Sequence, residues 1–322
     1  MYRRTFSKSL AASAALSVLP SVAKTDDPPV ALPIVDTHQH LWDLNQFKLA
    51  WLKKAPAILN RTYLTKDYLH AIRGLNINQC VYMEVDLDVS QQRDEAAYVI
   101  AISKDRDFPT VGGVISGRCD SHGFATYIRS YQGSPYIKGV RHILQAAEPG
   151  LCLQPQFIKS VQLLGKIGMS FDLTMRPTEL DDGLRLVKQC PDTLFVIDHC
   201  GVADPKAFMP KHRDRSLHQA EPWKRSMAAL AAETNTVCKI SGIIANVPKE
   251  WGTTDLAPIV KHCMNVFGPD RVLFGSDWPV CLLGGTLKKW VTTLKEIVSD
   301  SPLASQRKLF AENAIRYYRL ND

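Results

Sequence analysis

The 322-residue sequence contains neither an apolar run long enough to cross a bilayer nor a dense run of lysine and arginine. The first absence argues against a stable membrane span, because the apolar stretch at 9–19 is too short for a spanning helix. The second argues against nucleic acid as a partner, since a phosphate-tracking surface needs clustered basic side chains. The eight cysteines include no CxxC motif, and a chain of this size does not need a disulfide framework. We therefore expect most cysteines to be buried free thiols.

The first 23 residues are expected to be an export signal that lies outside the fold. Arg3 and Arg4 precede the apolar run, and Ser21-Val22-Ala23 forms a small-x-small cleavage signal. The segment resembles a twin-arginine signal, whose pathway carries folded proteins; an ordinary Sec signal and an uncleaved, membrane-tethering leader are the alternatives. We predict an exported protein, periplasmic or extracellular. Loss of the three basic residues of the leader would lower its formal net charge from +7 to +4.

A polar linker is expected at 24–32, followed by a single domain at 33–322 in which short apolar strands alternate with helical sequence. The hydrophobic content of 45% and the charged content of 22% are typical of a soluble globular protein. Predicted helices lie at 65–72, 91–104, 124–131, 156–167, 178–190, 223–233 and 255–267, with further helices to 318. Predicted strands lie at 33–40, 79–85, 110–115, 137–142, 169–173, 193–198, 236–240 and 271–275.

Eight strand–helix units predict the α/β class and a (β/α)8 TIM barrel. A doubly wound sheet is the alternative, but that fold would require a glycine-rich phosphate-binding turn after the first strand. This sequence has His38-Gln39-His40 there. In a barrel, the carboxyl ends of all strands converge on one mouth, where active sites are found. The residues at those ends are His38, His40, Glu84, Arg118, Arg141, His142, Asp172, Arg176, His199, Ser241 and Asp277.

We predict that the chemical core consists of three histidines and an aspartate. His38 and His40 point the same way because side chains alternate along a strand, and they can hold a metal ion or polarise a carbonyl oxygen. An ionised Asp277 can take a proton from water, with His199 beside it. The structural alternatives are satisfied or surface histidines for the pair, a core histidine for His199 and a helix cap for Asp277.

A second set of residues is predicted to bind substrate. Guanidinium groups suit a carboxylate or many hydroxyls, and aromatic faces can form the walls of a sugar site. Salt bridges for the arginines, core packing for the tryptophans and support of Arg141 by His142 are the alternatives. The set is Arg141, Trp42, Glu84, His142, Arg176 and Trp278. The other histidines lie on predicted helices or loops and are interpreted as surface residues: His70, His122, His212, His218 and His262.

Several motifs resemble a known family in order and spacing. They are His38-Gln39-His40, Lys138-Gly139-Val140-Arg141-His142, Arg176-Pro177, Asp198-His199-Cys200-Gly201, Lys239-Ile240-Ser241-Gly242 and Gly275-Ser276-Asp277-Trp278-Pro279. They look like the amidohydrolase-related group of the amidohydrolase superfamily. Within it they look most like the sugar-lactone hydrolase branch, which includes L-fuconolactonases and L-rhamnonolactonases and is related to 2-pyrone-4,6-dicarboxylate lactonases. The resemblance covers essentially the whole chain from about residue 33.

The resemblance implies that His38, His40, His199 and Asp277 correspond to the family's functional positions. It implies either one divalent metal, zinc or manganese, at these four residues or a metal-independent reaction. The superfamily often has a carboxylated lysine on strand four, where this chain has Arg141-His142, which argues against a binuclear centre. Glu84 departs from the family pattern and could be an extra ligand or a contact to sugar hydroxyls.

We therefore predict a hydrolase that opens a cyclic ester, a sugar-acid lactone, with Asp277 activating water and the histidines polarising the carbonyl. The expected partner is a small molecule, a lactone or sugar acid, and a homo-oligomer is left open. Two alternatives stand beside this prediction. One is a metal-dependent decarboxylase of the same superfamily, and the other is an exported sugar-acid binding protein without turnover.

Overall fold

The computed structural model describes Met1 and residues 32–320. The predicted leader and all but the last residue of the predicted linker lie outside the described residues. Within the described part, the strands form one parallel sheet in sequence order, from β1 to β8. The strands are β1 Ile34–Gln39, β2 Ile77–Met83, β3 Thr110–Ser116, β4 Ile137–Arg141, β5 Ser170–Leu173, β6 Phe195–Ile197, β7 Thr236–Ile240 and β8 Val272–Phe274.

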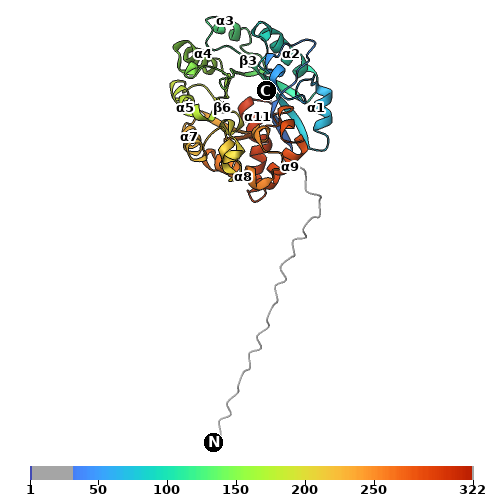
Figure 1. The fold of residues 1–322 in the computed structure, drawn as a ribbon, viewed down its shortest axis with the longest axis vertical. Coiled ribbons are helices and arrows are strands. Elements are labelled where there is room, and N and C mark those ends of the chain that lie inside the picture. The colour runs from blue at the N-terminus through green and yellow to red at the C-terminus, as the bar shows by residue number, and fades with distance from the viewer. Residues whose placement is uncertain (2–31, 321–322) are drawn as a thin grey trace. The chain divides into compact units, whose positions relative to one another are not determined.

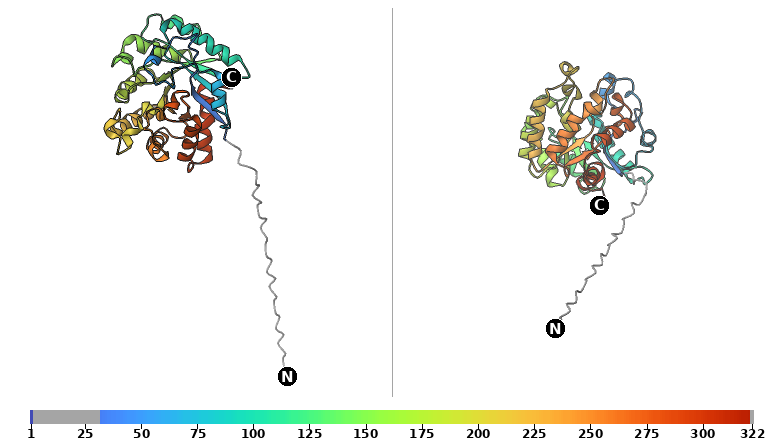
Figure 2. Two further views of the ribbon diagram at one scale, coloured as in Figure 1. Left: turned by 45° about the vertical axis from the view of Figure 1, so that its right-hand side comes forward. Right: turned by 90° about the horizontal axis from the view of Figure 1, so that it is seen from below.

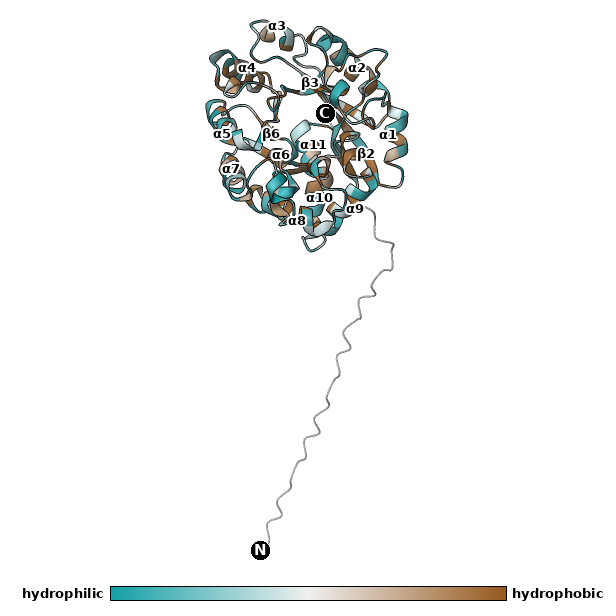
Figure 3. Cartoon of the chain, in the orientation of Figure 1, coloured by the Kyte–Doolittle hydropathy of each residue, from teal (hydrophilic) through white to brown (hydrophobic). Residues whose placement is uncertain are grey.

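The helices lie outside the sheet, as Figure 1 shows, so the predicted (β/α)8 barrel is confirmed and the doubly wound alternative is excluded. Their hydrophobic faces turn toward the strands (Figure 3). The helices are α1 Thr65–Ala71, α2 Gln92–Lys104, α3 Phe124–Arg129, α4 Pro155–Lys166, α5 Leu180–Gln189, α6 His199–Val202, α7 Ala220–Ala232, α8 Thr253–Phe267, α9 Leu287–Ile297, α10 Leu303–Arg307 and α11 Asn313–Tyr318. The long segment between β6 and α7, where no element was predicted, contains α6 and two short 3-10 turns, Pro205–Phe208 and Arg213–Arg215.

The barrel closes where the first strand meets the segment that follows the last one. The backbone N–H of Asp277 donates to the carbonyl of His38 (2.9 Å), and the N–H of His40 donates to the carbonyl of Trp278 (2.8 Å). These two bonds continue the pattern of a parallel sheet across the seam. Two of the predicted catalytic positions are therefore fixed to each other by the backbone.

Asp36 strengthens the same seam from inside the protein. Its fully buried carboxylate accepts hydrogen bonds from the N–H of Ser276 (2.7 Å) and from the hydroxyl of Tyr68 (2.6 Å). Next to it, Thr37 donates its hydroxyl hydrogen to the carbonyl of Phe274 (2.6 Å). Hydrogen bonds to a carboxylate are about twice as strong as neutral ones. These side-chain bonds therefore stabilise the seam in addition to its two backbone bonds.

Two hydrophobic clusters surround and fill the barrel. The larger one packs between the strands and the outer helices. The smaller one lies inside and joins strand residues such as Val81 and Val237 to Ala311, Ala314 and Tyr318 near the C-terminus. Figure 2 shows the last helices packed beside the first strand. The C-terminal segment thus covers the end of the barrel opposite the predicted mouth.

All eight cysteines are buried free thiols, as expected from their spacing. No helix among residues 32–320 is long and apolar enough to cross a membrane. Burial raises the pKa of several thiols, among them Cys80 and Cys281, so these groups are un-ionised at neutral pH.

Asn313 ties α11 to the start of β8 and offers a test of the C-terminal cover. Its buried side-chain amide donates to the carbonyls of Pro269 (2.8 Å) and Val272 (2.9 Å). We expect Asn313→Ala to lower the free energy of unfolding by about 1–3 kcal/mol, because the buried carbonyl of Val272 and the partly buried carbonyl of Pro269 lose their donor. The exposed neighbour Glu312 provides the control, Glu312→Ala, and both can be measured by urea unfolding. Equal stability of the two variants would contradict the assigned role.

Candidate active site

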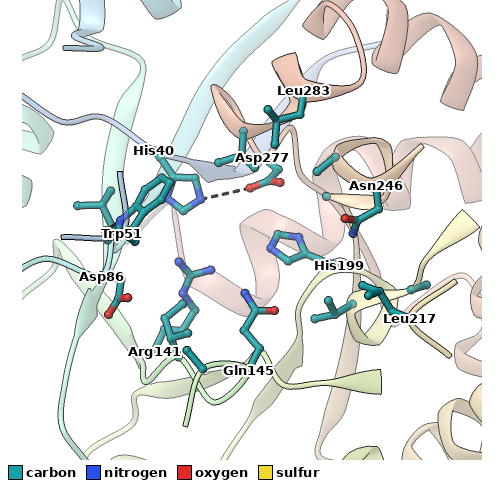
Figure 4. Close-up of a pocket in the computed structure, with 18 of the residues that line it drawn as sticks. His40, Trp51, Asp86, Arg141, Gln145, His199, Leu217, Asn246, Asp277 and Leu283 are labelled. Atoms are coloured by element: carbon teal, nitrogen blue, oxygen red, sulfur yellow. Dashed lines mark hydrogen bonds and ion pairs between the residues drawn. The ribbon is translucent and has the colours of Figure 1, made fainter. Parts of the chain in front are cut away.

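A cavity of about 450 Å³ opens at the carboxyl ends of the strands. The predicted residues that line it are His40, Trp42, Arg141, His199 and Asp277. Figure 4 shows the side chains of His40, His199 and Arg141 directed toward the carboxylate of Asp277. The end of β4 and the segments after β1, β2, β6 and β8 supply charged or imidazole groups to this space, as expected for the mouth of a barrel.

His40 and Asp277 form the closest pair in the cavity. Nδ1 of His40 lies 3.0 Å from the carbonyl oxygen of Met83, which can only accept, so Nδ1 carries the hydrogen. In the neutral imidazole, Nε2 is then an acceptor, yet it lies 3.2 Å from Oδ1 of Asp277. Two acceptors at this distance require a proton or a cation between them. The pair is therefore built to hold a positive charge.

His38 lies beneath the cavity and is fully buried. Its Nε2 is 3.2 Å from Nη1 of Arg141 and 3.7 Å from Oδ1 of Asp277, and its Nδ1 is 3.5 Å from Oδ1 of Asp198. Burial lowers its pKa well below the usual value, and the charge of Lys239 lowers the pKa further, against the opposite effect of Asp198. His38 is therefore a neutral ring at physiological pH.

His199 follows β6 at a backbone position with positive φ (54°), and Cys200 and Gly201 continue this left-handed turn. The turn brings the imidazole to the cavity, where Nδ1 lies 2.9 Å from the hydroxyl of Ser241. A Cβ atom at Gly242 would collide with the ring, so the close approach requires glycine there. Burial also lowers the pKa of His199, which keeps it neutral.

The guanidinium of Arg141 lines the cavity and contacts both Glu84 and Asp198. Its Nε donates to Oε1 of Glu84 (2.7 Å), Nη2 donates to the carbonyl of Glu84 (2.8 Å), and Nη1 lies 3.4 Å from Oδ2 of Asp198. Burial alone would lower the pKa of Arg141, but Glu84 and Asp198 raise it, so the guanidinium stays charged. Arg141 thus forms the salt bridge to Glu84 that was its structural alternative and also lines the cavity, whereas Glu84 does not line it.

Lys239 forms the centre of a charge network that the sequence did not reveal as part of the site. Its Nζ is fully buried and lies 2.8 Å from Asp172, 3.0 Å from Asp198 and 3.3 Å from Nδ1 of His38. Although burial alone would raise the pKa of Asp198, Lys239 and His38 hold it well below its usual range. Asp198 is therefore ionised beneath the cavity.

The buried cluster has an excess of carboxylates. Glu84, Asp172, Asp198 and Asp277 face only two fixed cations, Arg141 and Lys239. Burial raises the pKa of Asp172, which relieves part of this excess. The remaining negative charge favours a bound cation at the cavity floor.

Besides Glu84, three residues that were predicted to bind substrate do not line the cavity: Trp278, His142 and Arg176. Trp278 packs edge-on against Tyr63 and Tyr68 in the core, because the left-handed backbone at Asp277 (φ 56°) interrupts the strand alternation just before it. His142 alternates with Arg141, so its ring points outward and stacks on Phe157. Neither side chain lines the cavity, so the structure provides no support for either as a substrate contact.

The side chain of Arg176 binds other residues of the protein. Its guanidinium binds Glu179 (2.8 Å) and the carbonyls of Gln145 (2.6 Å) and Ala147 (2.8 Å), and it does not line the cavity. It supports the loop after β4. The histidine at position 218, interpreted as a surface residue, is buried, and its Nε2 accepts the N–H of Asp204.

Trp42 has both of the roles considered for it, a wall of the cavity and a residue of the core. It lines the cavity, yet it is fully buried and its indole N–H donates to the carbonyl of Arg61 (2.6 Å). Other cavity residues come from loops with no sequence signal, such as Trp51 and Leu217. Two signals could have revealed more of the network: a lysine inside the apolar strand 236–240, and an aspartate directly before His199.

The family comparison agrees with this geometry. The model of the amidohydrolase family matches residues 35–320, which is almost all of the described chain. The chain belongs to the amidohydrolase family.

Relatives of this amidohydrolase include an L-fucono-1,5-lactonase of Burkholderia multivorans, 26% identical over 298 residues, which cover 89% of this chain and 96% of the relative. An L-rhamnono-gamma-lactonase of Scheffersomyces stipitis is 27% identical over 205 residues, 57% of this chain and 59% of the relative. A crystal structure of an amidohydrolase from Burkholderia multivorans with bound zinc has a TM-score of 0.76 at 23% identity, covering 89% of this chain and 99% of that one. The amidohydrolase is thus a hydrolase with lactonase-named homologues.

The donor set of this amidohydrolase fits a divalent cation. Ligand atoms of His38, His40 and Asp277 all lie within 4.8 Å of one another. Neutral imidazoles with one carboxylate are typical zinc ligands, and the carbonyl of Met83 orients His40 as outer partners of metal-bound histidines do. Nη1 of Arg141 approaches Nε2 of His38, so an ion at that nitrogen would compete with the guanidinium.

Lys239 allows a direct test of the charge network. We expect Lys239→Met to lower the free energy of unfolding by about 3–5 kcal/mol, because two buried carboxylates lose their cation. Adding Asp172→Asn should restore part of this loss. Lys224 pairs with Glu221 on the surface, so the control Lys224→Met should cost less than about 1 kcal/mol. Urea unfolding measures all four proteins, and a small effect of Lys239→Met would contradict the network.

His142 predicts a pH dependence of stability. Burial lowers its pKa from 6.5 to about 4, so the folded chain binds no proton there in this window, whereas the unfolded chain does. Stability is therefore lost as pH falls below 6.5, by about 1.4 kcal/mol per pH unit for this one group. We expect His142→Gln to have a shallower loss than wild type between pH 6.5 and 4. The exposed His70 gives the control His70→Gln, whose slope should match wild type.

Proposed function

We propose that this amidohydrolase hydrolyses a cyclic ester, a sugar-acid lactone, at the cavity floor. One observation carries the proposal: the carboxylate of Asp277 faces the same cavity as the neutral imidazole of His199 and the charged guanidinium of Arg141. A base beside fixed donors for a developing negative charge is what ester hydrolysis needs. The lactonase names of the two relatives support the choice of a cyclic ester and of a sugar acid.

In the proposed reaction, Asp277 accepts a proton from a water molecule as the water oxygen attacks the lactone carbonyl carbon. Arg141, held by Glu84, binds the carbonyl oxygen as it gains negative charge, and His199 borders the same space. The ring C–O bond then breaks, and the proton held on Asp277 passes to the leaving alkoxide. The product is an open-chain hydroxy acid, so atoms and charge balance.

We also propose one divalent ion, zinc or manganese, at His38, His40 and Asp277, with His199 nearby. When bound, the ion supplies Lewis acidity at the lactone carbonyl. The bound zinc of the related Burkholderia structure supports this assignment, as does the excess of buried carboxylate.

The first experiment assays a panel of aldonolactones by proton release. We expect Asp277→Asn to lower kcat by a factor of about 10²–10⁴, because the general base and one proposed metal ligand are lost together. Asp300 is exposed and far from the cavity lining, so Asp300→Asn should keep the wild-type rate. No hydrolysis of any lactone by wild type, with decarboxylation of an aromatic acid in its place, would overturn the proposal. Binding of sugar acids without turnover would overturn it in favour of a binding protein.

Metal content is tested separately by elemental analysis of the purified protein. We expect about one zinc or manganese per chain in wild type and a large loss in His40→Gln. Three buried thiols, Cys200, Cys238 and Cys263, also lie close enough to hold an ion. The control Cys263→Ser should therefore keep its metal. Full lactonase activity in a protein that contains no metal would exclude the assigned ion.

A further inference from the structure

The cavity has two chemically different parts. The floor carries His40, His199, Arg141 and Asp277. Farther from the floor, the lining includes Val202, Leu217, Val280 and Leu283. In Figure 4, Leu217 and Leu283 lie on the side of His199 and Asn246, away from Trp51 and Asp86. We call these four apolar side chains the apolar compartment.

The exposure of two leucines in the apolar compartment is unusual for this protein. Leu217 is 57% exposed and Leu283 is 37% exposed. Among the described residues only eight large hydrophobic side chains are this exposed, and these two line the same cavity. Apolar surface that is left to water beside a catalytic group gains free energy when an apolar ligand covers it.

The compartment is assembled from separate loops that follow different strands. Val202 ends α6, and Leu217 lies between the turn Arg213–Arg215 and α7. Val280 and Leu283 bound the 3-10 turn η8, Val280–Leu283, after β8. The loops at the carboxyl ends of barrel strands determine specificity, so apolar residues that converge there from two loops indicate a substrate feature.

The size of the cavity points to a substrate larger than one sugar ring. About 450 Å³ is within the range of cavities that hold drug-sized ligands. A sugar-acid lactone that carries an apolar substituent would place its hydroxyl-bearing ring at the polar floor and its substituent against the apolar compartment.

We infer that the apolar compartment binds an alkyl or aryl substituent on the lactone ring, so that the substrate is a lactone with an apolar arm. The inference rests on the proposed function, because it places the ester carbonyl at Asp277 and Arg141. The arm then extends past His199 toward Leu217 and Leu283. Burial of each methylene in the compartment raises kcat/KM until the arm reaches the exposed rim.

The test measures kcat/KM for γ-butyrolactone, γ-hexalactone, γ-octalactone and γ-decalactone, with D-galactono-1,4-lactone as the polyhydroxylated comparison. We expect wild type to gain roughly fourfold for each added methylene. Leu217→Asn and Leu283→Asn replace apolar side chains with polar ones at exposed positions, so the fold should survive, and both should lose most of this gain in kcat/KM with chain length. Leu303 is equally exposed outside the cavity, and Leu303→Asn should keep the wild-type gain.

The outcomes separate the two proposals. A flat response to chain length, with efficient hydrolysis of D-galactono-1,4-lactone, overturns the apolar arm and leaves the proposed function intact. A gain with chain length that the two leucine variants retain also overturns it, because the arm would then bind elsewhere. Failure of wild type on every lactone overturns both.

Discussion

The active site depends on the seam at which the barrel closes. A parallel barrel must join its first and last strands, and here the joining backbone bonds pair His38 with Asp277 and His40 with Trp278, which fixes three of the predicted catalytic residues. The buried carboxylate of Asp36 reinforces that junction by binding Ser276 and Tyr68. The relative position of imidazole and carboxylate is therefore set by the same bonds that close the fold. Little freedom remains for the pair to separate, which is the preorganisation that catalysis by a fixed base requires.

Beneath the seam, electrostatics sets the protonation state of each group. The interior holds Lys239, Asp198 and Arg141 in contact, and their charges act in a medium that screens them weakly. Burial keeps His38 neutral, while Lys239 keeps Asp198 ionised. Removing one member leaves its neighbours uncompensated, so these residues act as one unit. The cavity floor is consequently polar and rigid, in contrast to the exposed leucines at its rim.

The sequence predicted the barrel and most of the cavity floor because both follow from local pattern. Strand alternation places His38 and His40 on one side, and strand ends in a barrel converge. The structure differs from the prediction at Trp278, where the backbone departs from that pattern, and at His142, where alternation itself directs the ring away from the cavity. The left-handed turn at Asp277 sends Trp278 into the core, and alternation after Arg141 turns His142 outward. Lys239 was missed because its role depends on partners from β5 and β6, and Leu217 because loop residues carry no periodic signal.

The C-terminal segment constrains the order in which parts of the barrel can fold. The hydroxyl of Tyr318 donates to Asp172 (3.0 Å), and Lys138 donates to the carbonyl of Arg319 (2.7 Å). Residues 318 and 319 thus complete the interior that β4 and β5 began. The two contacts join residues 146 and 181 positions apart in the sequence. The loop-closure entropy of such distant contacts must be overcome before they can form, so the interior of the barrel is completed late in folding.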